Sequence, residues 1–311
     1  MKKKIIYLPF DNGYFPVSDG YKLYYERYGN PEGIPIVYLH GGPGGGFDEK
    51  DKRFFNSKKW NVLLFDQRGS GKSTPFASVN NNTTQKLIDD IDKLMHKFKF
   101  KKVVLFGGSW GSTLALSYAI SKPNKVNGMI LRGIFLNTEV EYEYYYQAGR
   151  FLRPKVWERL VSHVPNNQRK NITRFYLEKI LSKDKKISQK YAYEFSLYEI
   201  SLISLRPNEA KIKKILSKNN LYQSLAAIEA YYLIHNCFLP KNYILNNIQR
   251  IENIPTIIVH GNYDLICPPQ SAYLLHKSLK NSTLKMVHAG HSASDRAIER
   301  ALVRSLEEFK G

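Results

Sequence analysis

The chain has 311 residues, of which 43% are hydrophobic and 13% aromatic, and its formal net charge is +20 at pH 7. This length allows a sizeable core, built either as one large domain or as a core domain with an insertion. The two cysteines, Cys237 and Cys267, exclude a disulfide framework and a cysteine metal site, and no stretch approaches the ~20 apolar residues of a membrane span.

The positive charge is spread along the chain. Small lysine clusters occur at 2–4, 183–186 and 211–214, without an RNA-binding aromatic motif or a zinc-site spacing. We therefore do not expect nucleic-acid or membrane binding. Because Pro9 and the following Asp-Asn-Gly break the apolar run after the basic start, we expect no signal peptide and a cytoplasmic location.

The first half of the chain alternates between predicted strands and helices. Residues 21–28 alternate like an antiparallel strand, whereas 36–40, 62–65, 103–106 and 126–132 are apolar runs typical of buried strands. Helices are predicted at 84–98, after a Thr start, and at 112–119. This alternation predicts an α/β protein with a doubly wound, mostly parallel sheet.

One predicted strand leads directly into Gly107-Gly108-Ser109-Trp110-Gly111, which is followed by a predicted helix. Glycines on both sides allow the tight turn of a nucleophile elbow, which would lift the Ser109 hydroxyl above the sheet edge at a helix N-terminus. The alternative is that Ser109 only caps the helix. The strand before it and the helix after it favour a hydrolase.

Between residues 131 and 256 the pattern changes to long helical segments rich in Lys, Tyr and Glu. A crossover between parallel strands needs only ~10 to 15 residues, so the excess predicts an inserted helical unit. We expect a helical cap at 137–246 above the carboxyl edge of the sheet, with the core formed by 1–136 and 247–311.

Two further predicted strands, 256–261 and 283–287, each end near a polar residue suited to catalysis. Asp264 follows the first of them and His291 the second. The chain order Ser, Asp, His is that of the α/β hydrolases. His288 could compete for the role of base, but it comes immediately off the strand.

Besides the Ser109 segment, five segments are rich in glycine or in residues suited to catalysis: His40-Gly41-Gly42-Pro43-Gly44-Gly45-Gly46, Asp66-Gln67-Arg68-Gly69-Ser70-Gly71-Lys72-Ser73, Leu131-Arg132-Gly133-Ile134-Phe135, His260-Gly261-Asn262-Tyr263-Asp264 and Ala289-Gly290-His291-Ser292. Taken together, these segments resemble the prolyl iminopeptidases over nearly the whole chain. The resemblance implies an α/β-hydrolase fold and a serine aminopeptidase that releases N-terminal proline from peptides, without metal or organic cofactor. It supports His291, within Ala-Gly-His-Ser, as the base.

The residue types suggest the chemistry. Ser109 would attack the carbonyl of the first substrate residue, His291 would transfer the proton, and Asp264 would orient the imidazole. The backbone N–H of Trp110 would be one oxyanion donor and the glycine loop would give the other, which the resemblance places at Gly42.

The cap would supply specificity, because an N-terminal ammonium needs buried carboxylates. The resemblance implies that Glu199 and Glu229 bind the substrate amine, that Phe135 and Tyr145 line the proline pocket, and that Arg132 precedes it. Leu233 stands where the family commonly has an aromatic residue, which predicts a wider pocket.

Two alternative functions remain open from the sequence. A carboxylesterase or lipase on the same core would use the same triad but would not need paired carboxylates. A basic binding protein on a dormant hydrolase scaffold would account for the charge, although the intact triad argues against it. A phosphate-binding loop ending in Gly71-Lys72-Ser73 is disfavoured because Asp66 replaces the required first glycine.

Overall fold

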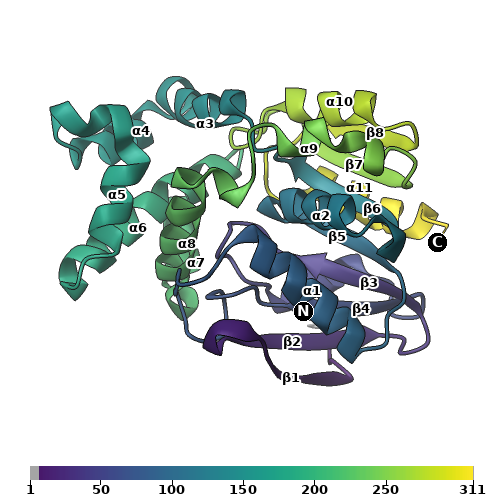
Figure 1. Cartoon of the computed structure of the whole chain (residues 1–311). Coiled ribbons are helices and arrows are strands. Elements are labelled where there is room, and N and C mark those ends of the chain that lie inside the picture. The colour runs from purple at the N-terminus through teal and green to yellow at the C-terminus, as the bar shows by residue number, and fades with distance from the viewer. Residues whose placement is uncertain (1–6, 311) are drawn as a thin grey trace, which may run out of the picture.

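The computed structural model describes residues 7–310. Residues 1–6, which include the basic start used in the signal-peptide argument, and residue 311 lie outside the described part. Within it, eight strands form one sheet in the order β1-β2-β4-β3-β5-β6-β7-β8 (Figure 1). The strands are β1 Asp11–Pro16, β2 Lys22–Gly29, β3 Ile34–Leu39, β4 Trp60–Phe65, β5 Val103–Ser109, β6 Val126–Ile134, β7 Thr256–Gly261 and β8 Ser282–Val287.

The sheet confirms the predicted doubly wound α/β architecture. β2 pairs antiparallel with β1 and β4, whereas β3 to β8 all run parallel. The carboxyl ends of these six strands therefore meet at one edge, where ligands bind in open α/β sheets. β1 was not predicted, because its sequence Asp-Asn-Gly-Tyr-Phe-Pro carries turn residues and becomes a strand by pairing with β2.

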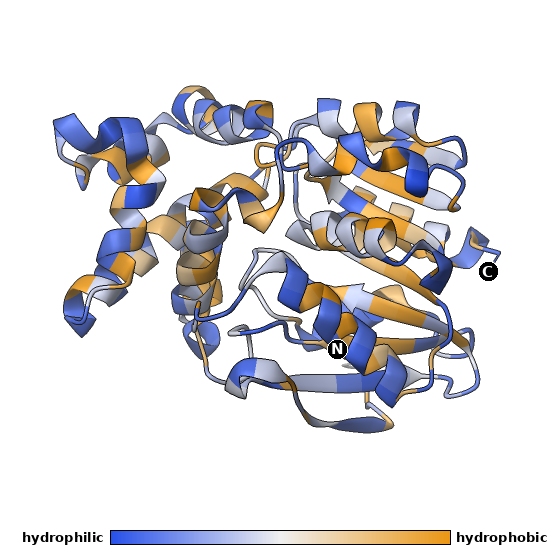
Figure 2. Ribbon diagram, viewed as in Figure 1, coloured by the Kyte–Doolittle hydropathy of each residue, from blue (hydrophilic) through white to orange (hydrophobic). Residues whose placement is uncertain are grey.

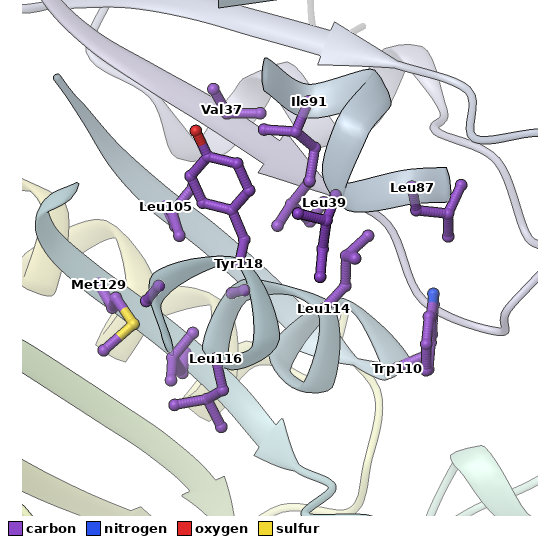
Figure 3. Packing of buried hydrophobic residues seen from close by; sticks show 14 of the residues in the cluster. Val37, Leu39, Leu87, Ile91, Leu105, Trp110, Leu114, Leu116, Tyr118 and Met129 are labelled. Atoms are coloured by element: carbon purple, nitrogen blue, oxygen red, sulfur yellow. The ribbon is translucent and has the colours of Figure 1, made fainter. Parts of the chain in front are cut away.

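Helices cover both faces of the sheet. Leu87 and Ile91 of one helix and Leu114 of another pack with Leu39 and Leu105 on one face (Figure 3). Figure 2 shows apolar residues along the central strands and polar residues on the outer sides of the covering helices. The helices of this face are α1 Thr84–Lys97, α2 Trp110–Ser121, α9 Tyr243–Asn246 and α10 Pro269–Ser278, and the opposite face is covered by α11 Arg296–Glu308 and the 3₁₀ helix η2 Glu49–Phe54.

The segment between β6 and β7 is helical, and most of it stands beside the sheet rather than on its faces (Figure 1). We call the following helices the cap: α3 Glu139–Leu152, α4 Pro154–Ser162, α5 Ile172–Ile180, α6 Lys185–Ile203, α7 Glu209–Ser217 and α8 Leu221–Ile234. Residues of α3, α4, α5, α6 and α8 form a second apolar core, which also includes residues 265–267 of the loop after β7.

Helix α8 lies between the two cores, which explains why its sequence is apolar on all sides. Ile228 and Tyr232 belong to the core between the sheet and helices α1 and α2, whereas Ala226 and Ala230 belong to the core of the cap. The Tyr232 ring packs edge-on against Trp110 with centroids 4.8 Å apart. A residue of α8 is therefore shielded from water on both sides.

No helix among residues 7–310 is both long enough and apolar enough to span a bilayer.

Candidate active site

Ser109 lies at the junction of β5 and α2, with φ 57° and ψ −129°. The turn requires glycine two residues before and two residues after Ser109. A Cβ on Gly107 would lie 2.2 Å from the Gly111 carbonyl oxygen, and a Cβ on Gly111 would lie 2.0 Å from the Leu39 carbonyl oxygen. The positive φ is costly for serine and typical of functional turns. The local sequence therefore forms the sharp strand-to-helix turn that a nucleophile elbow needs.

Asp264 and His291 are in direct contact. His291 Nδ1 lies 2.7 Å from Asp264 Oδ2, while Asp264 Oδ1 accepts hydrogen bonds of 2.9 Å from the N–H groups of Ile266 and Cys267. Tyr144 also donates its hydroxyl to the Asp264 carbonyl oxygen at 2.6 Å. These contacts fix the carboxylate so that it accepts a hydrogen bond from the Nδ1–H group, which leaves Nε2 as the basic nitrogen.

The electrostatics of this pair suit a neutral base beside a charged carboxylate. Burial would raise the pKa of Asp264, but the nearby His291 and its hydrogen bond outweigh burial and lower it. Burial lowers the pKa of His291 below its usual value, although Asp264 opposes the effect. Ser109 and His291 line one cavity, and no hydrogen bond joins their side chains within the described chain.

A second histidine, which the sequence reasoning did not single out, lies against Asp264. His260, the penultimate residue of β7, is fully buried with its Nε2 3.4 Å from Asp264 Oδ2. Its Nδ1 accepts the N–H of Ile134 at 3.1 Å, so Nε2 carries the proton and points to Asp264 and to the Cys267 carbonyl oxygen. The signal was available in the sequence, since His260 stands at a strand end four residues before Asp264.

The glycine loop after β3 approaches the nucleophile closely. A Cβ on Gly41 would lie 3.2 Å from Ser109 Cβ, and Gly42 has φ 111°, a conformation that favours glycine. Trp110 is the first residue of α2, so its N–H has no partner within the helix. Gly42 and Trp110, the two predicted oxyanion donors, thus lie on the two backbone segments that flank Ser109.

His40 and Gln67 hold these segments in place. Gln67 donates its backbone N–H to His40 Nε2 and its side-chain amide to the His40 carbonyl oxygen, both at 2.9 Å, and accepts the Trp110 indole N–H at 2.9 Å. Burial lowers the pKa of His40 to about 4, so the ring is neutral. These contacts fix the His40 ring beside the glycine loop, and Gln67 connects that loop to Trp110.

A cavity of about 570 Å³, open solvent included, lies beside Ser109 and extends toward the cap. It contains four of the five residues predicted to bind substrate, Phe135, Tyr145, Glu199 and Glu229, together with Leu233. We call it the glutamate pocket. Its remaining lining residues are Gly42, Pro43, Glu141, Tyr142, Tyr146, Thr173, Cys237, Ile266 and Cys267.

Glu199 from α6 and Glu229 from α8 are buried in this pocket without positive charge to balance them. Tyr145 donates its hydroxyl to Glu229 Oε1 at 3.5 Å, and the Oε2 atoms of both glutamates have no hydrogen-bond partner among residues 7–310. Burial raises the pKa of Glu199 to about 7. Burial and the charge of Glu199 raise the pKa of Glu229 well above its usual value. Burying two carboxyl groups with incomplete hydrogen bonding is costly, and the arrangement suits a cationic ligand.

Glu141 shows what a structural glutamate looks like in the same pocket. Its Oε1 accepts the Leu136 N–H at 2.8 Å and the Ser271 hydroxyl at 2.6 Å, and its Oε2 accepts the Thr138 N–H at 2.8 Å. The residue forms the capping box at the start of α3. All of its acceptor capacity is directed at the fold, unlike that of Glu199 and Glu229.

Arg132 lies outside the glutamate pocket and beneath the histidine. Its Nη1 donates to the His291 carbonyl oxygen at 2.7 Å, and its guanidinium packs so closely on Gly108 that a Cβ there would lie 2.5 Å from Nη2. It lines the neighbouring cavity that contains Ser109 and His291. Its contacts point to support of the histidine loop.

Two other sequence alternatives occupy ordinary structural positions. His288 is exposed, and its Nδ1 lies 3.4 Å from the Tyr263 hydroxyl, whereas His291 contacts Asp264. The Asp66 carboxylate accepts the N–H groups of Phe47 and Lys72 at 2.8 and 2.7 Å. A phosphate at this loop would have to displace that carboxylate from the Lys72 N–H group.

Within the described part of the chain no group of three or more His, Cys, Asp or Glu side chains is placed to hold a metal ion.

Comparisons with known proteins agree with this geometry. A family model for the alpha/beta hydrolase fold matches residues 34–296. The proline iminopeptidase of Arabidopsis thaliana is 40% identical over 317 residues, which cover 100% of this chain and 83% of that protein. The proline iminopeptidase of Xylella fastidiosa is 40% identical over 306 residues, which cover 97% of each protein.

A solved structure of a proline iminopeptidase from Mycobacterium smegmatis has a TM-score of 0.67 and 14% identity, and the match covers 96% of this chain and 98% of that one. At that identity the likeness shows the fold. The matches confirm the α/β-hydrolase fold and the family resemblance of the sequence motifs, and the chain belongs to the proline iminopeptidase family.

Proposed function

We propose that the chain is a serine aminopeptidase that releases N-terminal proline from peptides. The observation that carries the proposal is the pair of buried carboxylates of Glu199 and Glu229, whose Oε2 atoms lack hydrogen-bond partners among residues 7–310, in a pocket that also contains Ser109. A free amine bound there would place the carbonyl of the first residue beside the nucleophile. The names of the full-length relatives support the same activity.

Recognition of the amine follows from charge and desolvation. An N-terminal ammonium has a pKa of ~8 and is largely charged at neutral pH. Entering the pocket, it loses its water and gains hydrogen bonds to the two carboxylates, which lose the repulsion between them. A chain with an acylated N-terminus gains nothing from the pair and leaves both carboxylates unpaired. The pocket therefore favours exopeptidase over endopeptidase action.

The apolar walls suit the proline ring. Phe135, Tyr145 and Leu233 line the pocket, and Tyr145 is itself packed edge-on against Tyr198 with centroids 5.3 Å apart. Rigid aromatic walls leave little room for rearrangement when a side chain enters. We propose that these residues surround the pyrrolidine ring, and that Leu233 leaves more space than an aromatic residue would.

The proposed reaction has two steps. The Ser109 hydroxyl oxygen attacks the prolyl carbonyl while His291 Nε2 takes its proton, and the oxyanion that forms accepts the N–H groups of Gly42 and Trp110. When the C–N bond breaks, His291 gives the proton to the leaving amine, and a prolyl ester of Ser109 remains. Water then attacks this ester with His291 again as base, releasing proline. Asp264 keeps Nδ1 protonated throughout.

The test is a panel of aminoacyl arylamides with free and acetylated N-termini. The proposal expects hydrolysis of the proline arylamide, weak hydrolysis of other residues and none of the acetylated compound. An esterase on the same core would instead hydrolyse a p-nitrophenyl acyl ester far better than the proline arylamide and would be indifferent to acetylation. That result would overturn the proposed function.

A cytoplasmic location is part of this proposal. Both cysteines are free and buried, and they are too few for the disulfide framework of a secreted scaffold. Cell fractionation followed by the proline arylamide assay tests it, since activity recovered outside the cytoplasmic fraction contradicts it.

A further inference from the structure

The glutamate pocket would receive only the first residue of a peptide, and the rest of the substrate must leave by another route. We infer that the leaving peptide runs into a lysine-lined cleft that recognises a carboxylate on it. This inference rests on the proposed function and specifies which N-terminal-proline peptides would be preferred. Its ligand is a carboxylate of the leaving peptide, supplied either by its C-terminus or by an acidic side chain.

The route is continuous along the described surface. A second cavity, which we call the mouth, contains Ser109 and His291 and shares Gly42, Ser109 and Glu199 with the glutamate pocket. At its other side the mouth shares Gly46, Ile203 and Leu221 with an open cleft of about 1660 Å³, solvent included. We call this the lysine cleft. With the amine held by Glu199 and Glu229, residues beyond the scissile bond point through the mouth toward it.

One wall of the lysine cleft is cationic. It contains Lys211, Lys214 and Lys218, which come from α7 and the residue after it and follow the i, i+3, i+7 spacing of one helix face. Lys213 lies on the same helix, is exposed and does not line the cleft. The charge is therefore gathered on the side that faces the substrate route.

The negative charges of the cleft are already engaged. Asp48 forms an ion pair with Lys218 and accepts the Lys50 N–H at 3.0 Å, while Asp51 Oδ2 accepts the Asp48 N–H at 2.8 Å. Among residues 7–310, neither Lys211 nor Lys214 forms an ion pair. These two ammonium groups remain available to an incoming carboxylate.

A partly exposed ion pair of this kind is weak and sensitive to salt. Each such pair contributes little, so the two lysines together would raise kcat/KM about 2- to 10-fold at low ionic strength, which corresponds to about 0.4–1.4 kcal/mol. Screening at 0.5 M salt would remove most of that preference. The two lysines would select among peptides without being needed for bond cleavage.

The experiment compares three peptides, Pro-Ala-Ala with a free C-terminal carboxylate, its C-terminal amide, and Pro-Asp-Ala amide. At 20 mM salt, the wild-type chain should hydrolyse Pro-Ala-Ala, Pro-Asp-Ala amide or both with a kcat/KM about 2- to 10-fold higher than that for the neutral Pro-Ala-Ala amide. The responding peptide identifies the source of the carboxylate. The double variant Lys211→Gln/Lys214→Gln should lose this preference while hydrolysing proline arylamide normally.

The matched control is Lys213→Gln/Lys190→Gln, which removes the same charge from exposed cap positions outside the cleft lining. It should keep the preference. Equal rates on all three peptides by the wild type, or an unchanged preference in Lys211→Gln/Lys214→Gln, would overturn the inference while leaving the proposed function intact. Failure of the wild type on proline arylamide itself would instead remove the proposed function and this inference with it.

Discussion

The carbonyl oxygen of Ile203 accepts hydrogen bonds from the backbone N–H groups of His291 and Ser292, each at 3.1 Å. Ile203 is the last residue of α6, and Glu199 lies one turn earlier on the same helix. The close approach needs Gly290, whose added Cβ would lie 3.2 Å from the same oxygen. The cap helix that carries Glu199, one of the two glutamates proposed to bind the amine, is thereby joined to the loop that carries the predicted base.

This connection predicts that ligand binding in the cap protects the histidine loop from hydrogen exchange. The amides of His291 and Ser292 exchange only when they separate from Ile203, and a ligand held by Glu199 should oppose that opening. Free proline at saturating concentration should therefore slow exchange in a peptide spanning 288–295 several-fold. Amides of the central strand β3 should not change. Unchanged exchange of the loop in proline-saturated protein would contradict the coupling.

Ser109→Ala and His291→Ala should each lower kcat for proline arylamide by on the order of 10⁴ or more, because the members of a triad act as one unit. Circular dichroism and thermal unfolding should show an intact fold. Treatment with EDTA should leave the wild-type rate unchanged, since the proposed chemistry uses only side chains and backbone N–H groups. Substantial turnover by purified Ser109→Ala would refute the proposed nucleophile.

Glu229→Gln should reduce kcat/KM for proline arylamide by about 10²–10³, because it removes one counter-charge from a desolvated ammonium at a cost of roughly 3–5 kcal/mol. An acyl ester without an N-terminal amine should lose much less, since its reaction needs only the triad and the oxyanion donors. Glu143→Gln, an exposed glutamate of the same cap, serves as the control. Equal losses on amide and ester would mean that Glu229 only supports the cap.

The pH profile should depend on whether the substrate carries an amine. A raised pKa keeps a carboxyl neutral until the pH reaches it, so the pair gains charge only as the pH rises through about 7, the pKa of Glu199. His291 has a lowered pKa and is already neutral above its usual value of ~6.5. Between about pH 6.5 and 7.5, kcat/KM should therefore rise for proline arylamide and stay flat for the acyl ester. Identical acid limbs for the two substrates would show that the glutamates do not titrate in recognition.

Local patterns predicted much of the core and of the candidate site. The sequence marks β7 at its observed bounds and places β5 and α2 around Ser109, because an apolar run, a glycine pair and a helix start are all read from neighbouring residues. β1 escaped prediction because its strand conformation depends on β2. Residues far apart in the chain could not be paired by such reasoning.

The glutamates illustrate the same limit within one pocket. In the sequence Glu229 stands in an apolar run, whereas Glu141 has Glu139 and Glu143 close by, as on a solvated helix face. Glu141, Glu199 and Glu229 nevertheless all prove to be buried. What separates them is whether donors from other segments reach the carboxylate, as Ser271 reaches Glu141. The position of Arg132 under His291 and the link from Ile203 to the same loop likewise depend on the packed fold.

The positive φ at Ser109 lowers the stability of the fold, and the proposed activity needs the serine that adopts it. A non-glycine residue at φ 57° costs on the order of 1–3 kcal/mol, which the surrounding sheet and helix must sustain. Glycine would remove that cost and, with it, the side chain that is proposed to attack the substrate. Folding stability alone would therefore favour glycine at position 109, and the proposed catalysis explains why serine stands there.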